Sequence, residues 1–149
     1  MMIKMVDTKN SEFIAIIRVR GMTKIRSEIK DTMNMLGLTK KHSMVIRKST
    51  PSIIGMVKKV KDYVTYGFVS KDFVDEFELN TTFHLHPPRG GFERGGIKKN
   101  VSVGGALGFR GDKISVLISK MMPNQEVDKP KKETKSSSSK VEEETVAEV

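Results

Sequence analysis

The sequence lacks several features that would each indicate a class of protein. It has no cysteine, which excludes a disulfide framework and a thiolate metal site. No apolar run approaches the ~20 residues that a membrane-spanning helix needs, and the first residues lack the apolar centre of a signal peptide. Aromatic residues make up only 6% of the chain, so part of its 149 residues is expected to remain unpacked. These absences predict a cytoplasmic protein without a membrane partner.

Acidic charge is also scarce in the part of the chain that is expected to fold. Residues 120–149 hold seven acidic and six basic residues around a serine run, which predicts a disordered tail over 122–149. Residues 1–119 hold 21 basic and 11 acidic residues, a net charge of +10. Such an excess opposes folding by self-repulsion. It therefore predicts a polyanionic partner, and nucleic acid is the first candidate.

The patterns in the first half of the chain predict a small α+β domain over residues 13–68, after an N-terminal arm over 1–12. Strand-forming residues and helical apolar spacing alternate along it. The expected order is a strand over 13–19, a helix over 23–37, a strand over 43–46, a helix from Thr50 to about Lys61, and a strand over 63–66. In the first strand, Phe13 and Ile17 should lie on one face, and Ile14 and Ile16 on the other.

Several residues mark where these elements should begin and end. Thr23 is the expected N-cap of the first helix and Gly37 its expected stop. Thr50 followed by Pro51 predicts the start of the second helix. Gly67 is expected to end the third strand.

Residues 69–121 are predicted to form an extension. It should contain a short helix over 70–77, an extended segment over 81–85, and a basic loop rich in proline and glycine that reaches Gly111. Asp112 should cap a last helix that turns Ile114, Leu117 and Ile118 inward. The loop itself is expected to be a flexible cationic arm that only phosphate contacts would order.

The pair His84-x-His86 leaves alternatives open. A metal-dependent nuclease or phosphodiesterase could use both imidazoles, but zinc needs at least a third ligand and no cysteine is available. A small-ligand regulatory module is a second alternative, because small sheets of this kind also bind metabolites. The glycines between Gly104 and Gly111 match no phosphate-loop pattern. No serine or threonine lies beside a plausible base, so we predict no catalytic residues, no metal ligands and no cofactor.

RNA binding explains the basic residues better than these alternatives do. An imidazole beside Pro-Pro-Arg-Gly-Gly can stack on a base or donate to a phosphate, and the glycines let the backbone approach closely. Basic residues also flank the second strand at both ends. The predicted RNA-binding residues are Arg18, Arg20, Lys24, Arg26, Lys40, Lys41, Arg47, Lys48, His86, Arg89, Arg94, Lys98, Lys99 and Arg110.

Several motifs, in order, resemble a known family. They are the strand ending in Arg-Val-Arg-Gly at 18–21, the helix ending in Thr-Met-Asn-Met-Leu-Gly-Leu at 32–38, the second helix from Thr50, and the Leu-His-Pro-Pro-Arg-Gly-Gly-Phe motif at 85–92. The chain is similar to the large-subunit ribosomal protein L-thirty family of archaeal and eukaryotic type, whose eukaryotic counterpart is called L-seven. The similarity covers about residues 13–121.

The resemblance implies a three-stranded sheet with two helices on one face, a variant of the ferredoxin-like fold. It implies a structural constituent of the large ribosomal subunit that binds large-subunit rRNA in the neighbourhood of the 5S RNA region, beside other ribosomal proteins. It implies no enzyme activity and no small-molecule substrate. Archaeal members often carry a longer insert before the Pro-Pro motif, whereas residues 69–80 here are short.

Overall fold

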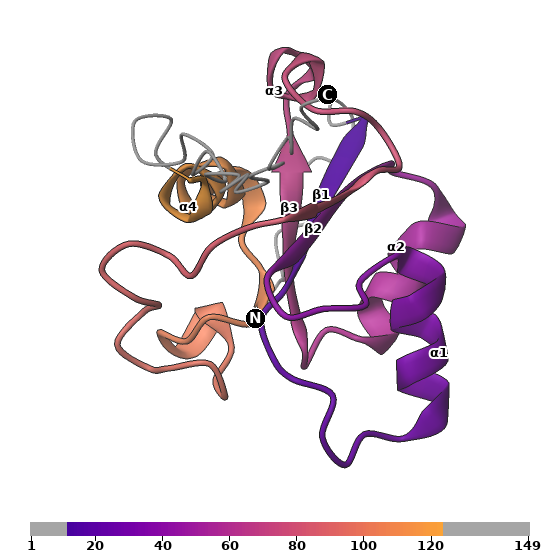
Figure 1. Cartoon of the computed structure of the whole chain (residues 1–149), viewed down its shortest axis with the longest axis vertical. Coiled ribbons are helices and arrows are strands. Elements are labelled where there is room, and N and C mark those ends of the chain that lie inside the picture. The colour runs from indigo at the N-terminus through magenta and orange to yellow at the C-terminus, as the bar shows by residue number, and fades with distance from the viewer. Residues whose placement is uncertain (1–11, 124–149) are drawn as a thin grey trace, which may run out of the picture.

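The computed structural model describes residues 12–123, which form a five-stranded mixed sheet with helices on both faces (Figure 1). The strands stand in the order β4-β2-β1-β3-β5. The strands are β1 Phe13–Arg18, β2 Ser43–Lys48, β3 Val64–Val69, β4 Thr82–His84 and β5 Gly108–Phe109. The helices are α1 Ser27–Leu36, α2 Pro51–Lys59, α3 Lys71–Asp75 and α4 Ile114–Met121, with 3₁₀ turns at Val101–Val103 and Gly111–Lys113. The predicted α+β class and the three core strands are confirmed, and β4 and β5 extend the sheet at its two edges.

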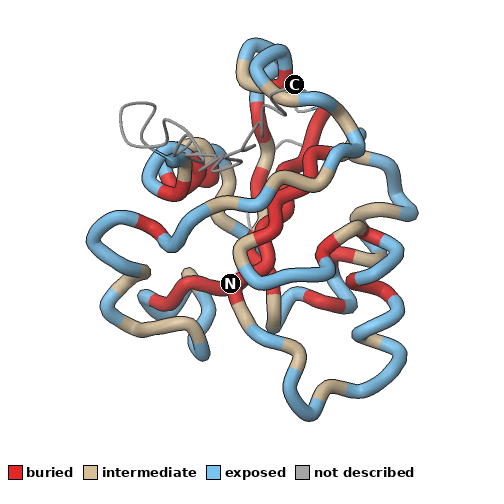
Figure 2. The backbone as a smooth tube through the Cα atoms, in the orientation of Figure 1, coloured by how far each residue is buried: buried red, intermediate tan, exposed pale blue. Residues whose placement is uncertain are grey.

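The central strand β1 is buried on both faces. It pairs antiparallel with β2 and with β3, and every residue of it is buried. Phe13 and Ile17 pack on one side, and Ile14 and Ile16 pack on the other, as the alternation predicts. Figure 2 shows the buried residues concentrated along these inner strands. Each fully buried isoleucine here contributes about 1.5–3 kcal/mol to the stability of the fold.

Helices α1 and α2 cover the face of Ile14 and Ile16, as expected. The cluster beneath them comprises Ile14, Ile16, Met33, Leu36, Leu38, Val45, Val57, Val60 and Val64. Helix α4 covers the opposite face, and Figure 1 shows it on the far side of the sheet from α1 and α2. Its inward residues Ile114, Leu117 and Ile118 are buried, which confirms the predicted stripe. No helix among residues 12–123 is long and apolar enough to span a membrane.

The predicted helix ends are partly correct. The Thr50 hydroxyl accepts a hydrogen bond from the Ile53 amide at 3.3 Å, and Gly37 ends α1 in the left-handed conformation. The prediction that Thr23 caps α1 was wrong, because α1 begins at Ser27 with Arg26 in the N-cap position. Lys24 has a φ of 55°, which cannot continue a right-handed helix.

The start of the last helix also differs from the prediction. Residues Gly111–Lys113 form a 3₁₀ turn, and Lys113, not Asp112, precedes the first residue of α4. No side chain caps this helix by a hydrogen bond. Asp112 contributes its backbone carbonyl instead, which accepts a bond of 2.9 Å from the Ser115 hydroxyl.

Gly67 lies inside β3, so the prediction that it ends the strand was wrong. A β-carbon at this position would lie 2.2 Å from the carbonyl oxygen of Gly111 and 2.8 Å from the β-carbon of Ile114. The glycine therefore allows the start of α4 to pass directly against the strand. Close approach of another backbone is one of the two common reasons for glycine within a strand.

The segment between β4 and β5 is folded onto the sheet, contrary to the expectation of a flexible arm. A small cluster of Val19, Ala106 and Leu107 packs against Phe92 and Ile97. Backbone hydrogen bonds link the two halves of the segment: Gly95 donates to Gly104, Ala106 to Gly96, and Leu107 to Lys99, at 2.9–3.1 Å. Apolar contacts with Val19, directly after β1, and these internal bonds hold the segment on the sheet.

Candidate nucleic-acid interface

Basic residues gather at one end of the sheet, where β1 ends and β2 begins. We call this surface the basic end, and it comprises Arg20, Lys24, Arg26, Lys40, Lys41 and Lys98. The first three follow β1, the next two form the turn before β2, and Lys98 comes from the segment between β4 and β5. All are exposed except Arg20, which is half-buried. The topology thus places six of the predicted RNA-binding residues, from three separate parts of the chain, at the same end of the sheet, and two of them, Arg20 and Lys98, line one hollow.

A polar hollow of about 350 Å³ lies within the basic end and is lined by Arg20, Asp62, Tyr63, Lys98, Asn100 and Leu107. The Arg20 guanidinium carbon lies 5.1 Å from the centre of the Tyr63 ring, a cation–π contact. Its Nη1 donates to the backbone carbonyl of Asp62 at 3.3 Å. Two bonds fix the backbone here, since the amides of Val19 and Arg20 both donate to the Tyr63 carbonyl at 3.1 Å. The hollow combines a fixed guanidinium with an ammonium, which suits a phosphate group.

Arg18 belongs to the fold and is buried beneath this surface. It is only 2% exposed. Its Nη1 donates to the carbonyls of Leu38 at 3.0 Å and Thr39 at 2.6 Å, and its Nε donates to the Arg20 carbonyl at 2.9 Å. Burial lowers the pKa of Arg18 from its ordinary value. The side chain thereby holds the turn that presents Lys40, and its donors point inward.

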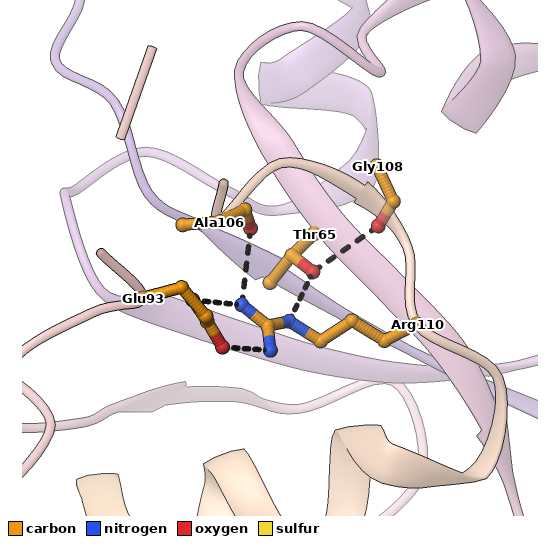
Figure 3. A network of polar contacts seen from close by, with 5 residues as sticks. All are labelled: Thr65, Glu93, Ala106, Gly108 and Arg110. Carbon is orange, nitrogen blue, oxygen red and sulfur yellow. Dashed lines mark hydrogen bonds and ion pairs between the residues drawn. The ribbon is translucent and has the colours of Figure 1, made fainter. Parts of the chain in front are cut away.

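Arg110 is likewise an internal group, with 7% of its side chain exposed. Figure 3 shows its polar contacts with Glu93, Thr65 and Ala106. It forms a bidentate ion pair with Glu93, in which Nη2 donates to Oε2 at 2.7 Å and Nη1 donates to Oε1. Its Nε donates to the Thr65 hydroxyl at 3.0 Å, and Thr65 donates in turn to the Gly108 carbonyl at 3.1 Å. The hydrogen bond from Arg110 lowers the pKa of Glu93. This network fastens the segment between β4 and β5 to strand β3.

Arg47 and Lys48 lie at the opposite end of β2 from Lys41. Six residues of strand separate the two ends, about 20 Å. Lys48 is exposed, whereas Arg47 is half-buried, and both line a second hollow of about 220 Å³ with Thr50 and Ile53. Positive charge thus lies at both ends of the sheet, as predicted, but on two surfaces.

The remaining predicted residues of the extension are exposed. Arg89 lies against the end of α4: its amide donates to the Lys120 carbonyl at 3.0 Å and its Nη2 to the Met122 carbonyl at 3.4 Å. The His86 amide donates to the Met121 carbonyl at 2.9 Å. Arg94 and Lys99 are exposed on the segment itself. Arg89 and His86 therefore lie on the α4 side of the molecule.

The histidines do not assemble a metal site in the part of the chain that the structure describes. His84 is exposed on edge strand β4, opposite Ser43. Across residues 12–123, no three histidine or carboxylate side chains gather as metal ligands. His42 instead stacks on Phe92, with ring centres 6.1 Å apart and planes inclined by 16°. Burial lowers the pKa of His42, and the positive charge of Lys41 lowers it further.

Sequence reasoning missed four residues that line the hollow, namely Asp62, Tyr63, Asn100 and Leu107. Tyr63 was predicted only as a strand former, and Asn100 received no role. The register of β1 on β3 pairs Arg18 with Val64, which brings Arg20 beside Tyr63. Antiparallel pairing of the two predicted strands is the signal that could have found Tyr63. Asn100 had no such signal.

Comparison with known proteins places the fold in a family. A family model described as ribosomal protein L30p/L7e matches residues 14–64, from β1 to the start of β3. Large ribosomal subunit protein uL30 of Methanococcus maripaludis is 37% identical over 151 aligned positions, which cover 72% of this chain and 98% of that protein. The uL30 proteins of Methanopyrus kandleri and Nanoarchaeum equitans are 36% and 31% identical, over 70% of this chain and 100% and 95% of their own lengths.

The coverage also shows that this chain is shorter than its relatives within the aligned region. Since 72% of 149 residues is about 107, about 44 of the 151 aligned positions have no counterpart here. The similarity to uL30 proteins along nearly their whole length shows that this chain belongs to the ribosomal protein L30p/L7e family.

Proposed function

We propose that this chain is a structural constituent of the large ribosomal subunit in the cytoplasm and that it binds large-subunit rRNA through its basic end. Membership of a ribosomal protein family supports a structural role in translation and not an enzymatic one. The observation that carries the RNA-binding part is the hollow in which Arg20 and Lys98, from opposite halves of the chain, lie beside Tyr63.

The mechanism is electrostatic docking on a preformed surface. The cationic side chains displace counterions from phosphates, and this sequence-independent term gives most of the affinity. The fold supplies the positions, because Arg18 holds the turn that carries Lys40, and Arg110 anchors the segment that carries Lys98. If the six residues of the basic end each met one phosphate, log affinity would fall with log salt at a slope of about −4 to −5.

Other predicted residues have secondary places in this proposal. Arg47 and Lys48 form a separate contact at the far end of the sheet, and Arg89, Arg94, Lys99 and His86 offer further contacts along the extension. Arg18 and Arg110 serve the fold. The same proposal includes two points that the family resemblance implies. They are a position in the neighbourhood of the 5S RNA region and contacts with adjacent ribosomal proteins.

The experiment compares two charge-matched double variants on extracted large-subunit rRNA. Arg20→Ala with Lys98→Ala removes the cations of the hollow, and we call this double variant the hollow variant. Lys58→Ala with Lys113→Ala removes two exposed lysines outside the basic end. Binding is measured over a salt series, and circular dichroism confirms that both proteins fold.

We expect the hollow variant to bind more weakly and its salt slope to shrink by about 1.5–2, since two phosphate contacts are lost. The control should lose less affinity and keep a slope close to that of the parent chain. Equal slopes for the hollow variant and the parent would show that these residues do not contact phosphate.

A further inference from the structure

Three aromatic rings gather on β3 and β5, and we call them the aromatic edge: Tyr66, Phe68 and Phe109. Tyr66 stands opposite Phe109 in the parallel register of the two strands, with ring centres 5.6 Å apart. Phe68 meets Phe109 edge to face at 5.5 Å and 72°. Phe109 is 40% exposed, and the other two rings are half-buried. The sheet thus presents aromatic surface to solvent at this edge.

The helices on this face leave the aromatic edge incompletely covered. Ile14 and Ile16, the neighbours of Phe68 and Tyr66 on β1, are buried in the cluster beneath α1 and α2. Tyr66 touches the margin of that cluster, but Phe68 and Phe109 lie outside it and pack on each other. Exposed apolar surface of this kind is available to a partner.

The aromatic edge follows residues of the hollow along the chain. Tyr63, which lines the hollow, precedes Tyr66 by three residues, about 10 Å along the chain. Leu107, which also lines the hollow, precedes Phe109 by two residues. Strands β3 and β5 therefore begin beside two lining residues of the hollow and carry the three rings.

This juxtaposition matches the two chemical parts of an unpaired nucleotide. Cations bind its phosphate, and an aromatic ring stacks on its base whatever the base is. We infer that the aromatic edge is a stacking site for an unpaired rRNA base whose neighbouring phosphate lies in the hollow between Arg20 and Lys98. This inference rests on the proposed function, and it adds that the contacted rRNA is single-stranded at this point.

Base pairing and protein contacts fit the surface less well. A base inside a duplex already has both faces stacked, so it offers none to Phe109. An apolar side chain of a neighbouring protein could cover the rings, but it would bring no anion to the hollow, where two cations, Arg20 and Lys98, outnumber the one carboxylate, Asp62. Cations that line the hollow and rings that follow it on the same strands favour a ligand that carries both a flat ring and a negative charge.

The chain contains an intrinsic probe for this site. Its only two tyrosines are Tyr63 and Tyr66, and it has no tryptophan. In a Tyr63→Phe background, Tyr66 is the single tyrosine fluorophore. We would titrate this full-length protein with oligoadenylate of about ten nucleotides, within the usual site size for single strands, and with an RNA duplex of equal length.

We would then attach a fluorescent label to the same two RNAs and measure their affinities for a set of variants of the parent chain by fluorescence anisotropy. Phe109→Leu removes the ring but keeps an apolar side chain, and Phe109→Tyr keeps the ring. Val116→Ala is the matched control, because Val116 is 56% exposed on α4, away from the aromatic edge. The hollow variant Arg20→Ala with Lys98→Ala is measured beside them.

We expect oligoadenylate, but not the duplex, to quench Tyr66. Phe109→Leu should weaken single-strand binding about fivefold or more, since one stacked base contributes about that factor or a larger one. It should leave duplex binding unchanged, and Phe109→Tyr and Val116→Ala should bind like the parent.

The outcomes separate this inference from the proposed function. If the hollow variant loses affinity for both RNAs while Phe109→Leu loses none, the stacking site is refuted and the proposed function stands. If the hollow variant keeps the parent's affinity and salt slope, the proposed function fails. If Phe109→Leu binds both RNAs normally but enters large subunits poorly, a neighbouring protein covers the rings and the inference is overturned.

Discussion

The network around Arg110 yields the most detailed prediction. Arg110→Met keeps an unbranched apolar side chain of similar reach but removes every donor to Glu93, Thr65 and the Ala106 carbonyl. Breaking a buried ion pair by removing one partner costs about 3–5 kcal/mol. Because 37% of the Glu93 side chain is exposed, water can rehydrate its carboxylate, so we expect the lower value of about 2–3 kcal/mol.

The reasoning is tested by a double-mutant cycle. Glu93→Gln keeps one acceptor oxygen and should cost about 1 kcal/mol, and the double variant should show a coupling energy of about 1–2 kcal/mol. Urea unfolding at neutral pH gives the four free energies. Hydrogen exchange at the amides of Ala106 and Leu107, which donate to Gly96 and Lys99, should quicken in Arg110→Met. The amides between β1 and β2 should exchange as before.

The coupling energy between Arg110 and Glu93 should also decrease as the pH falls. The folded-state pKa of Glu93 is lowered, so its contribution is complete above the ordinary value of 4.5 and disappears as the pH falls through the lowered value. An additive cycle at neutral pH, or a cost below about 0.5 kcal/mol for Arg110→Met, would refute the claim that this pair anchors the extension.

Three further substitutions test the packing of the sheet and the turn before β2. Gly67→Ala should destabilise the protein by about 3 kcal/mol in urea unfolding, because its β-carbon would strike the Gly111 carbonyl oxygen. Gly55→Ala, in α2 with open space around its β-carbon, should stabilise it by about 1 kcal/mol, and equal effects of the two changes would contradict the close approach. Because the pKa of His42 is lowered in the folded protein, the unfolded chain binds a proton at a higher pH than the folded protein does. The free energy of unfolding should therefore keep its full value above the ordinary pKa of 6.5 and decline as the pH falls toward the folded-state pKa. His42→Asn, which tolerates the φ of 63°, should flatten that decline, and an unchanged pH profile would remove the role of His42.

The elements that sequence predicted well are those with strong local signals. The alternation in β1, the apolar spacing of α1, α2 and α4, and the Thr50-Pro51 start are all properties of neighbouring residues. Two of the misassigned features depend on distant partners. Gly67 serves a contact with Gly111, and the ordered extension depends on Arg110 reaching Thr65, 45 residues away.

The basic end was predicted in composition but not in arrangement. Charge alone placed Arg18 among the RNA-binding residues, although it shares a strand face with Ile14 and Ile16 and is buried there. Its alternation with those isoleucines was visible in the sequence and indicated the helix-covered face. The meeting of Arg20 and Lys98 could not be predicted, because it depends on how the extension folds back on the sheet.

The order of strands in the sheet has a consequence for how the protein is made. In the order β4-β2-β1-β3-β5, the central strand is synthesised first, its two neighbours follow, and the outermost strands are synthesised last. Because domains form from the N-terminal side during synthesis, each new strand emerges when the edge that it will pair with can already exist. The nascent chain would thus expose the open edges of β2 and β3 only until β4 and β5 leave the exit tunnel, which limits the time for edge-to-edge aggregation.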